Sequence, residues 1–333
     1  MTEDAQRLRR RSLPRAVVVV SLVLGAILAV GGIPLCAALE GPRTFRLGLA
    51  NEGGPTDIPQ VAEFTLASGG RTPEYMLWYQ DFRQPFDATA LAAVPLSATP
   101  LLTWEPFDST RGAEQTEYRL ERIAAGEFDT YIAQWARDLA GSGREVVLRF
   151  AHEPNGDWYP WSERVNGNAA GDYARAWRHV HDVFREAGTQ NVKWMWSPNV
   201  EVDGSTPLME LWPGSDYVDL IGIDGYNWGM SQPGKRWQTP DEVFTATVDQ
   251  VRQITDKPLI ISEVASAEQG GNKAAWIDQF GLFLNENPLI EGFVWFDYNK
   301  EADWRVDSSP ASRDAFQRLV SGLPQAVAES SLP

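Results

Sequence analysis

Short apolar runs recur along the chain, and most of them are apolar at nearly every position. The runs cover residues 45–50, 75–79, 100–104, 146–151, 192–196, 219–223, 259–262 and 293–296. A half-exposed antiparallel strand alternates apolar and polar side chains, whereas a parallel strand covered on both faces is apolar throughout. The pattern therefore predicts eight buried parallel strands.

Helical patterns lie between these runs. Apolar residues recur at helical spacing in 128–139, 173–184, 243–254 and 276–284, and Thr239 followed by Pro240 marks the start of the third. Strands and helices alternate over about 280 residues, and no Gly-rich dinucleotide motif follows the first strand. We therefore expect the α/β class, as a closed (β/α)8 TIM barrel rather than an open doubly wound sheet.

The first forty residues differ from the rest. Five arginines precede an uncharged segment, 16–39, which is long enough to cross a membrane as a helix with its N-terminus in the cytoplasm. Pro34 and the small residues near Ala38 also fit a cleaved signal peptide, so both interpretations stay open. We divide the chain into 1–40 as signal peptide or membrane anchor, 41–323 as the barrel and 324–333 as a disordered tail. The barrel is then expected outside the cell, secreted or anchored to the outer face of the cytoplasmic membrane.

Composition narrows the classes of partner. Lys and Arg total 29 against 45 Asp and Glu, so the net charge is −16 and nucleic acid is a poor partner. The single cysteine, Cys36, excludes an intrachain disulfide and a zinc site built from cysteines. The acidic positions in 297–303 lack the Gly and the closing Glu of a calcium loop. We expect no metal, no cofactor, no membrane contact beyond the N-terminal segment, and a monomer.

Candidate chemistry is sought where the predicted strands end, because active sites of such barrels lie at the C-terminal ends of their strands. Glu153 ends the fourth predicted strand and Glu263 the seventh, and a barrel brings these ends to one mouth. A glycosidic bond is cleaved when one carboxyl group protonates the leaving oxygen and a second acts as nucleophile or base. The two glutamates are therefore the candidate catalytic pair.

Tryptophans also gather at predicted strand ends, where indole faces would stack on sugar rings. These residues are Trp78, Trp104, Trp158, Trp161, Trp196, Trp228, Trp295 and Trp304. Trp135, Trp177 and Trp276 fall on predicted helices instead, and for them we expect packing between helix and barrel. The substrate class that fits both features is a polysaccharide.

Four segments together resemble glycoside hydrolase family 26, which contains β-mannanases and some mixed-linkage β-glucanases. The segments are VVLRFAHEPNGDWYPW (146–161), IGIDGYNW (221–228), IISEVAS (260–266) and FVWFDYNKEADWR (293–305). The resemblance covers roughly residues 44–320 in the right order, and several motifs in register are more specific than any one of them.

The resemblance implies a role for each matching residue. Glu153 matches the acid/base and Glu263 the nucleophile of a retaining enzyme, in which the two carboxyl groups lie about 5 to 5.5 Å apart. The remaining matches concern substrate binding and support of the catalytic pair. They are Arg149 beneath the acid/base, His152 before it, Trp158 and Trp161 flanking it, Tyr226 holding the nucleophile and Trp295 as the floor of the subsite for the attacked sugar.

Two departures from the family pattern bear on the substrate. Pro154 stands where many family mannanases have Met, and residues 158–161 read WYPW. We expect a β-linked polysaccharide, with mannan or glucomannan first, because mannanase is the commoner activity of the family, and mixed-linkage β-1,3-1,4-glucan as the alternative. A non-catalytic carbohydrate-binding protein on the same scaffold is a further alternative, and so is an enzyme that trims the cell's own exported polysaccharide.

Overall fold

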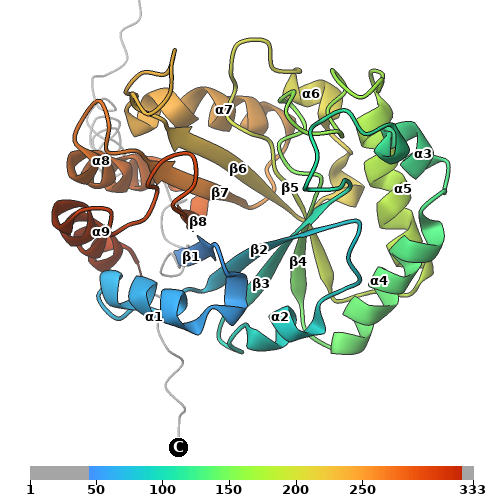
Figure 1. The fold of residues 1–333 in the computed structure, drawn as a ribbon, viewed down its shortest axis with the longest axis horizontal. Coiled ribbons are helices and arrows are strands. Elements are labelled where there is room, and N and C mark those ends of the chain that lie inside the picture. The colour runs from blue at the N-terminus through green and yellow to red at the C-terminus, as the bar shows by residue number, and fades with distance from the viewer. Residues whose placement is uncertain (1–44, 325–333) are drawn as a thin grey trace, which may run out of the picture. The chain divides into compact units, whose positions relative to one another are not determined.

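The computed structural model describes residues 45–324, and in them eight parallel strands close into a barrel in sequence order (Figure 1). The strands are β1 (Arg46–Asn51), β2 (Tyr75–Asp81), β3 (Thr99–Glu105), β4 (Val146–Phe150), β5 (Val192–Trp196), β6 (Leu220–Asn227), β7 (Leu259–Ser266) and β8 (Ile290–Asp297). The predicted (β/α)8 fold is confirmed. The predicted signal or anchor segment lies outside the described residues, as does the tail from residue 325 onward.

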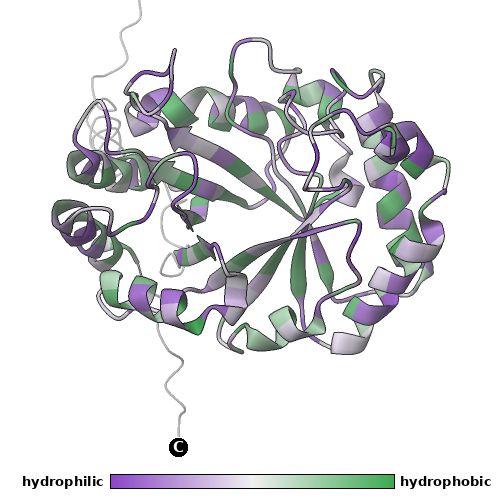
Figure 2. Ribbon diagram, in the orientation of Figure 1, coloured by the Kyte–Doolittle hydropathy of each residue, from purple (hydrophilic) through white to green (hydrophobic). Residues whose placement is uncertain are grey.

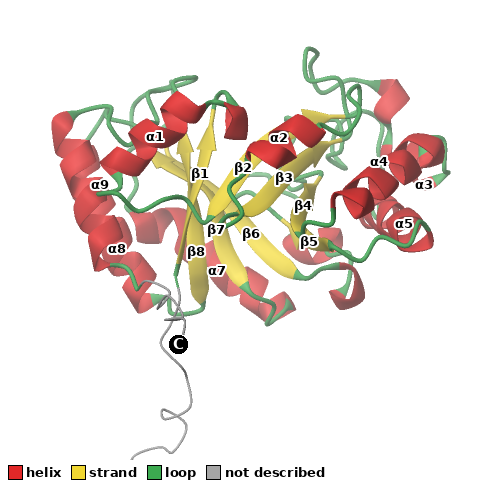
Figure 3. Ribbon diagram, turned by 90° about the horizontal axis from the view of Figure 1, so that it is seen from below, coloured by secondary structure: helices red, strands yellow, loops and turns green. Residues whose placement is uncertain are grey.

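Helices connect successive strands and surround the barrel (Figure 3). The α-helices are α1 (Ile58–Ala67), α2 (Ala88–Ala93), α3 (Leu120–Ala124), α4 (Asp129–Ser142), α5 (Asp172–Glu186), α6 (Leu208–Leu211), α7 (Pro240–Ile254), α8 (Lys273–Glu286) and α9 (Pro310–Gly322). Short 3₁₀ turns are η1 (Gly54–Thr56), η2 (Thr116–Tyr118) and η3 (Ser215–Tyr217). Among the described residues no helix is both long and apolar enough to cross a membrane.

Capping residues and glycines mark where the helices begin and end. Thr239 caps α7 through a reciprocal capping box with Glu242, and Pro240 occupies the first turn, where a missing N–H costs nothing. Gly143 ends α4 with a φ of 64°, in the left-handed region that glycine enters without a Cβ clash. In α5 the buried side chains Tyr173, Trp177, Val180 and Phe184 follow helical spacing, so one face of the helix covers the barrel.

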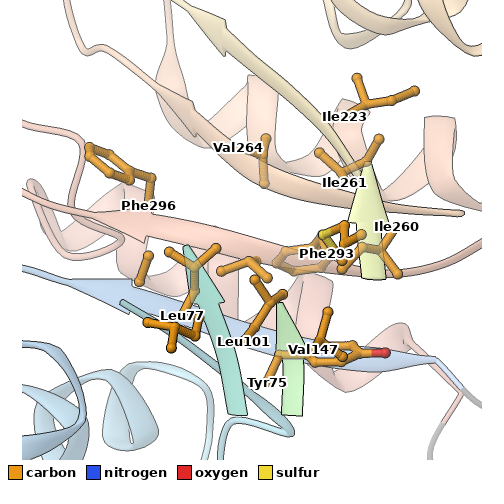
Figure 4. Close-up of a cluster of buried hydrophobic side chains, with 14 of the residues drawn as sticks. Tyr75, Leu77, Leu101, Val147, Ile223, Ile260, Ile261, Val264, Phe293 and Phe296 are labelled. Atoms are coloured by element: carbon orange, nitrogen blue, oxygen red, sulfur yellow. The ribbon is translucent and has the colours of Figure 1, made fainter. Parts of the chain in front are cut away.

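The strands and the faces of the helices that cover them share the apolar core. Figure 4 shows one cluster of buried side chains contributed by β2, β3, β4, β6, β7 and β8, among them Leu77, Leu101, Val147 and Ile261. Figure 2 shows the hydrophobic colour along the strands and hydrophilic segments on the surrounding helices. This burial explains why the strands were recognisable as continuous apolar runs.

Strand β7 contains a bulge that matters for the site. Ile223 of β6 pairs with Ile261, but the next β6 residue, Asp224, pairs with Glu263, so β7 has one extra residue, Ser262. The register against β8 shifts over the same part of β7. A bulge re-aims neighbouring side chains, and here both Ser262 and Glu263 reach polar partners in the barrel.

Candidate active site

A cavity of about 840 Å³ is lined by side chains from the C-terminal ends of the strands and the loops that follow them. Both candidate catalytic carboxylates line it. Its other acidic and aromatic walls include Glu52, Glu105, Tyr79, Phe107, Trp158, Tyr159, Tyr226, Trp228, Phe296, Tyr298 and Trp304. The location is the one expected for a (β/α)8 enzyme.

Glu263, within β7, is held by three donors. The hydroxyl of Tyr79 donates to Oε1 at 2.7 Å, Arg149 Nη2 donates to the same oxygen, and the hydroxyl of Tyr226 donates to Oε2. Burial and the charge of Glu263 raise the pKa of both tyrosines well above the ordinary phenol value, so both keep the protons that they donate. This arrangement stabilises negative charge on Glu263 and fixes the direction of its carboxylate.

The guanidinium of Arg149 is fully buried and joins three strands. Nε donates to Thr103 Oγ1 of β3 at 2.8 Å and Nη1 to Asp224 Oδ2 of β6 at 2.8 Å, while Nη2 reaches Glu263 of β7. Burial opposes its charge, but the two carboxylates beside it hold the pKa of Arg149 above its usual value. Arg149 hydrogen-bonds within the site, as the family resemblance implies, and its direct carboxylate partner at the cavity is the predicted nucleophile, Glu263.

Two serines donate hydrogen bonds to the carboxylate of Asp224. Ser262 donates to Oδ1 at 2.6 Å and Ser197 to Oδ2 at 3.1 Å, and the two hydroxyls lie 2.8 Å apart. Gly222 leaves the room that they need, because a Cβ there would lie 2.2 Å from the Ser262 hydroxyl. The buried charge of Asp224 is thus fully hydrogen-bonded, as a buried carboxylate must be.

Glu153 follows β4 in a tight turn whose backbone is unusual. Ala151 and Glu153 have φ values of 46° and 51°, a region that costs non-glycine residues about 1–3 kcal/mol each. The backbone N–H of Glu153 donates to the carbonyl of Ser197 at 2.6 Å, which ties the turn to the end of β5. The strain lies at the residue predicted to transfer the proton, in accord with the clustering of strained residues at active sites.

The carboxyl group of Glu153 differs from that of Glu263 in its surroundings. Its hydrogen bond is from Trp158 Nε1 to Oε2, at 2.7 Å. Burial raises the pKa of Glu153 well above the ordinary carboxyl value, and the negative charges of Asp224 and Glu263 raise it further. A buried carboxyl group that holds its proton can serve as a general acid near neutral pH.

His152 and Glu105 form the adjoining wall. Tyr159, whose pKa is raised by burial, lies with its hydroxyl 3.1 Å from His152 Nε2, and Glu105 Oε1 lies 4.0 Å from Nδ1. Burial, aided by the charge of Arg149, lowers the pKa of His152 well below its ordinary value, so the ring is neutral. Burial also raises the pKa of Glu105 to about 8. Two uncharged polar groups therefore face the cavity here.

The structure brings most of the predicted site residues together. Around the cavity lie His152, Glu153, Trp158, Tyr226 and Glu263, with Arg149 beneath them. Of the other tryptophans at predicted strand ends, Trp228 and Trp304 also line the cavity, whereas Trp78 and Trp196 are buried in the core. The helical Trp135, Trp177 and Trp276 are buried as expected.

Three predicted substrate-binding tryptophans do not reach the cavity. Trp104 is stacked on Trp135 of α4 at 4.7 Å, and Trp295 packs edge-on against Phe316 of α9 at 5.2 Å. Trp161 is fully buried and stacks on Tyr159, and its indole N–H donates to the carbonyl of His152. Predicted direct sugar contacts for these three residues are therefore wrong. Trp161 instead supports the wall behind Tyr159 and His152.

The alternation of side chains along a strand explains two of these errors. Successive residues of a strand point to opposite faces. In β3, Thr103 and Glu105 point toward the site, so Trp104 between them faces the helices; in β8, Phe296 lines the cavity, so Trp295 does not. The same rule accounts for two cavity residues that lie outside the predicted site, Tyr79 within β2 and Tyr298 after β8, because both share the inward parity of their strands.

Among the described residues no group of three or more His, Cys, Asp or Glu side chains is placed to hold a metal ion. The carboxylate of Glu263 is instead occupied by Arg149 and by the hydroxyls of Tyr79 and Tyr226. What the arrangement offers chemically is one carboxylate held by three donors and one carboxyl group that burial keeps protonated. Such a pair is suited to acid and nucleophilic or basic catalysis.

Residues 97–287 match the family model described as glycosyl hydrolase family 26. Endoglucanase H of Acetivibrio thermocellus is 40% identical over 257 residues, which are 74% of this chain and 27% of that protein. Mannan endo-1,4-beta-mannosidase A and B of Caldalkalibacillus mannanilyticus is 26% identical over 184 residues, 52% of this chain and 33% of that protein. The chain thus spans about a third or less of the length of these two curated relatives.

The fold is shared with solved structures as well. The catalytic domain of the Bacillus sp. JAMB-750 GH26 endo-beta-1,4-mannanase superposes with a TM-score of 0.64 at 18% identity, over 84% of this chain and 86% of that one. At this identity the likeness concerns the fold.

Glu105 generates a prediction about stability and pH. The folded protein keeps this carboxyl protonated up to about pH 8, whereas the unfolded chain releases the proton near the ordinary value of 4.5. The folded state therefore binds more protons in this interval, and stability falls as pH rises, by up to about 1.4 kcal/mol for each pH unit. Glu105→Gln should remove this part of the pH dependence, so the variant gains stability relative to the unaltered chain at about pH 8 but not at about pH 5.

Urea unfolding at the two pH values measures the effect. Glu186→Gln, at the exposed end of α5, is the matched control and should behave as the unaltered chain does. Equal free energies of unfolding for Glu105→Gln and the control at both pH values would show that Glu105 is not held in its neutral form.

Proposed function

Since the chain belongs to glycosyl hydrolase family 26, and is therefore a glycoside hydrolase, we propose that it cleaves β-linked polysaccharides internally, by double displacement with retention of configuration. The observation that carries the proposal is the contrast between its two carboxyl groups. Glu263 accepts three hydrogen bonds and is suited to attack as a carboxylate, whereas burial keeps Glu153 protonated and suited to donate.

In the first step the bond between the anomeric carbon and the glycosidic oxygen breaks. Glu263 attacks the anomeric carbon and Glu153 gives its proton to the departing oxygen, so the leaving chain departs as an alcohol. Arg149, Tyr79 and Tyr226 hold Glu263 in position while an electron pair of its carboxylate forms the new ester bond to the anomeric carbon, which neutralises the charge of the carboxylate. Glu153 is left as a carboxylate.

In the second step a water molecule displaces Glu263 from the anomeric carbon. Glu153 accepts a proton from a water molecule, the water oxygen attacks the anomeric carbon, and the ester bond to Glu263 breaks. The loss of negative charge on Glu263 in the intermediate removes one of the causes that raise the pKa of Glu153, which favours its new role as a base. The sugar is released with the configuration it had in the polysaccharide.

The aromatic walls of the cavity suit a polysaccharide. Trp158 has 41% of its surface exposed beside the acid/base, and Trp228 and Tyr298, in the loops after β6 and β8, also line the cavity. Indole and phenol faces stack on the apolar faces of sugar rings without requiring charge on the ligand. The acidic residues around the cavity disfavour a strongly anionic glycan.

Two neutral polysaccharides are the leading substrates. β-Glucan is favoured by the 40% identity to a protein named an endoglucanase, over 257 residues. Mannan, placed first from the sequence, is supported by relatives named mannan endo-1,4-beta-mannosidases, at 26% identity over 184 residues in one case. We put β-glucan first because the identity is higher and extends further along the chain.

The biological setting follows from residues outside the described part. We propose that the segment 16–39 exports the barrel, as a cleaved signal or as an anchor in the cytoplasmic membrane. An anchored enzyme would suit trimming of the cell's own exported polysaccharide, and a released one would suit foraging.

Replacing the nucleophile should abolish turnover. We expect Glu263→Ala to lower kcat by roughly 10⁴-fold or more, because the covalent intermediate no longer forms. Azide, a small anionic nucleophile, should enter the space and restore part of the rate on an activated aryl glycoside, giving a glycosyl azide of inverted configuration. Proton NMR of the product anomer reports the outcome. Near-normal turnover of Glu263→Ala, or inversion by the unaltered enzyme, would contradict the assignment.

Replacing the acid/base should have an effect that depends on the leaving group. Glu153→Ala should lose about 10²–10⁴-fold on a polysaccharide, where the leaving oxygen needs a proton, and far less in the glycosylation of a dinitrophenyl glycoside, where it does not. For the unaltered enzyme, activity on polysaccharide should fall as pH rises through the raised pKa of Glu153, and this alkaline decline should be absent from the variant. Burst-phase and steady-state kinetics across pH test both points. Glu186→Ala is the control. Equal losses of rate by Glu153→Ala on the polysaccharide and on the dinitrophenyl glycoside would contradict the assignment of Glu153 as the acid.

A substrate panel ranks the candidate glycans. Residues 41–333 are incubated with lichenan, barley β-glucan, glucomannan, galactomannan, xylan and curdlan, and the products are sized over time. We expect the highest kcat/KM on a β-glucan and early products of mixed length, as an internal cut gives. Preference for galactomannan would put mannan first, and binding without cleavage of any glycan would favour a carbohydrate-binding protein on the same scaffold.

A further inference from the structure

Lys273, the first residue of α8, is a buried cation that lies outside the cavity. A positive charge at a helix N-terminus is disfavoured by the helix dipole, and a buried lysine loses its hydration. The helix does not need it as a cap, because Asn272 Oδ1 already accepts the N–H of Ala275 at 3.0 Å. Lys273 therefore does not stabilise the start of α8, and its contribution must come from the contacts of its ammonium group.

The ammonium group of Lys273 holds the loop that follows β8. Nζ donates to the carbonyl of Arg305 at 2.7 Å, to the carbonyl of Asp303 at 3.2 Å and to the hydroxyl of Ser308 at 2.8 Å. All three donors of the ammonium are thus used, and all three acceptors belong to one loop. This contact ties the loop after β8 to the start of α8.

The groups around Lys273 keep it charged near neutral pH. Burial, aided by the charge of Arg305, lowers the pKa of Lys273, while Glu268, Asp303 and Asp297 act in the opposite direction, and the net pKa is about 8. Glu268, just after β7, also accepts hydrogen bonds from Ser308 of this loop and from Ser312 in the first turn of α9, at 2.8 Å each. The protonated amine keeps all three hydrogen bonds.

Trp304 lies between the two carbonyls that Lys273 holds. It lines the cavity, and its ring meets Trp228 edge-on at 5.0 Å and lies 5.3 Å from the ring of Tyr226. Tyr226 in turn donates to the predicted nucleophile, Glu263. One continuous set of contacts therefore leads from Lys273 through Trp304 and Tyr226 to Glu263.

We propose that Lys273 is a positioning residue for the hydrolysis, which holds Trp304 in the cavity wall against Tyr226 without touching the substrate itself. The inference rests on the proposed function, because it assigns Lys273 a part in the reaction of that site. Lys273 acts by fixing the backbone on both sides of Trp304, so its effect on the reaction passes through this one side chain.

A double-mutant cycle in kcat/KM tests the route. Lys273→Met keeps the apolar stem and removes the three donors, and on the glycan that the enzyme hydrolyses best it should lower kcat/KM by about 10- to 100-fold, as a small misplacement of site groups does. In a chain that already carries Trp304→Ala, the same change should cost less than about twofold, because the side chain that it positions is gone. A general loss of structure would lower activity on both backgrounds alike. Circular dichroism at the assay temperature confirms that each variant is folded.

The cycle has matched controls. Lys193→Met, at an exposed position of β5, should leave kcat/KM unchanged. Should Lys273→Met not fold, Ser308→Ala and Ser312→Ala replace it, since both hydroxyls donate to Glu268 and only Ser308 contacts Lys273. We then expect Ser308→Ala to lower kcat/KM more than Ser312→Ala does, and only when Trp304 is present.

The outcomes separate the two proposals. Two results would overturn the positioning role alone, provided that the unaltered enzyme is active. One is a folded Lys273→Met variant with full kcat/KM. The other is a loss of kcat/KM on Lys273→Met that is as large in the Trp304→Ala background as in the unaltered chain. Equal effects of the two serine variants do the same. Inactivity of the unaltered chain on every glycan of the panel overturns the proposed function and this inference with it.

Discussion

The charge of Arg149, buried at the centre of the barrel, is the constraint on which the site depends. A buried guanidinium is tolerated only when its donors are satisfied and its charge is balanced. Thr103, Asp224 and Glu263 supply this from three different strands, and the serines beneath Asp224 complete the network. The direction of Glu263 is therefore set by the electrostatics of the barrel interior rather than by a surface loop.

Most of the fold could be predicted from the sequence, because burial on both faces leaves a continuous apolar run for each parallel strand. What could not be predicted is how far the strands extend. The runs at 219–223 and 259–262 continue as β6 and β7 through Asn227 and Ser266, over polar residues that the site requires. Asp224 and Glu263 are polar because they serve Arg149, and hydrophobic patterning has no signal for that. The bulge at Ser262 is likewise invisible in the pattern, since it depends on pairing with two neighbouring strands.

The candidate site was predictable in its carboxylates and less so in its aromatic walls. Glu153 and Glu263 follow apolar runs whose ends a barrel must bring together, so topology alone was enough to place them at one cavity. The tryptophans needed a second criterion, the face of the strand on which each lies. Trp104 and Trp295 sit one residue away from inward-facing positions and pack on helices, while Tyr79, one residue after Trp78, reaches Glu263. Because successive side chains of a strand point to opposite faces, a shift of one residue moves a side chain from the cavity to the core.

The two catalytic candidates show how one barrel gives identical side chains different chemistry. Both are glutamates with little exposed surface, so burial alone does not distinguish them. The difference lies in the donors: Glu263 accepts hydrogen bonds from a guanidinium and two phenols, and Glu153 accepts one from an indole while facing the charges of Glu263 and Asp224. Burial is the main cause that raises the pKa of Glu153, and the negative charges of Asp224 and Glu263, both paired with Arg149, raise it further. In the double displacement that we propose, the charge on Glu263 is lost when its carboxylate bonds to the anomeric carbon, so the protonation of Glu153 follows the progress of the reaction. The buried Arg149 stabilises the charge that Glu263 carries at the start.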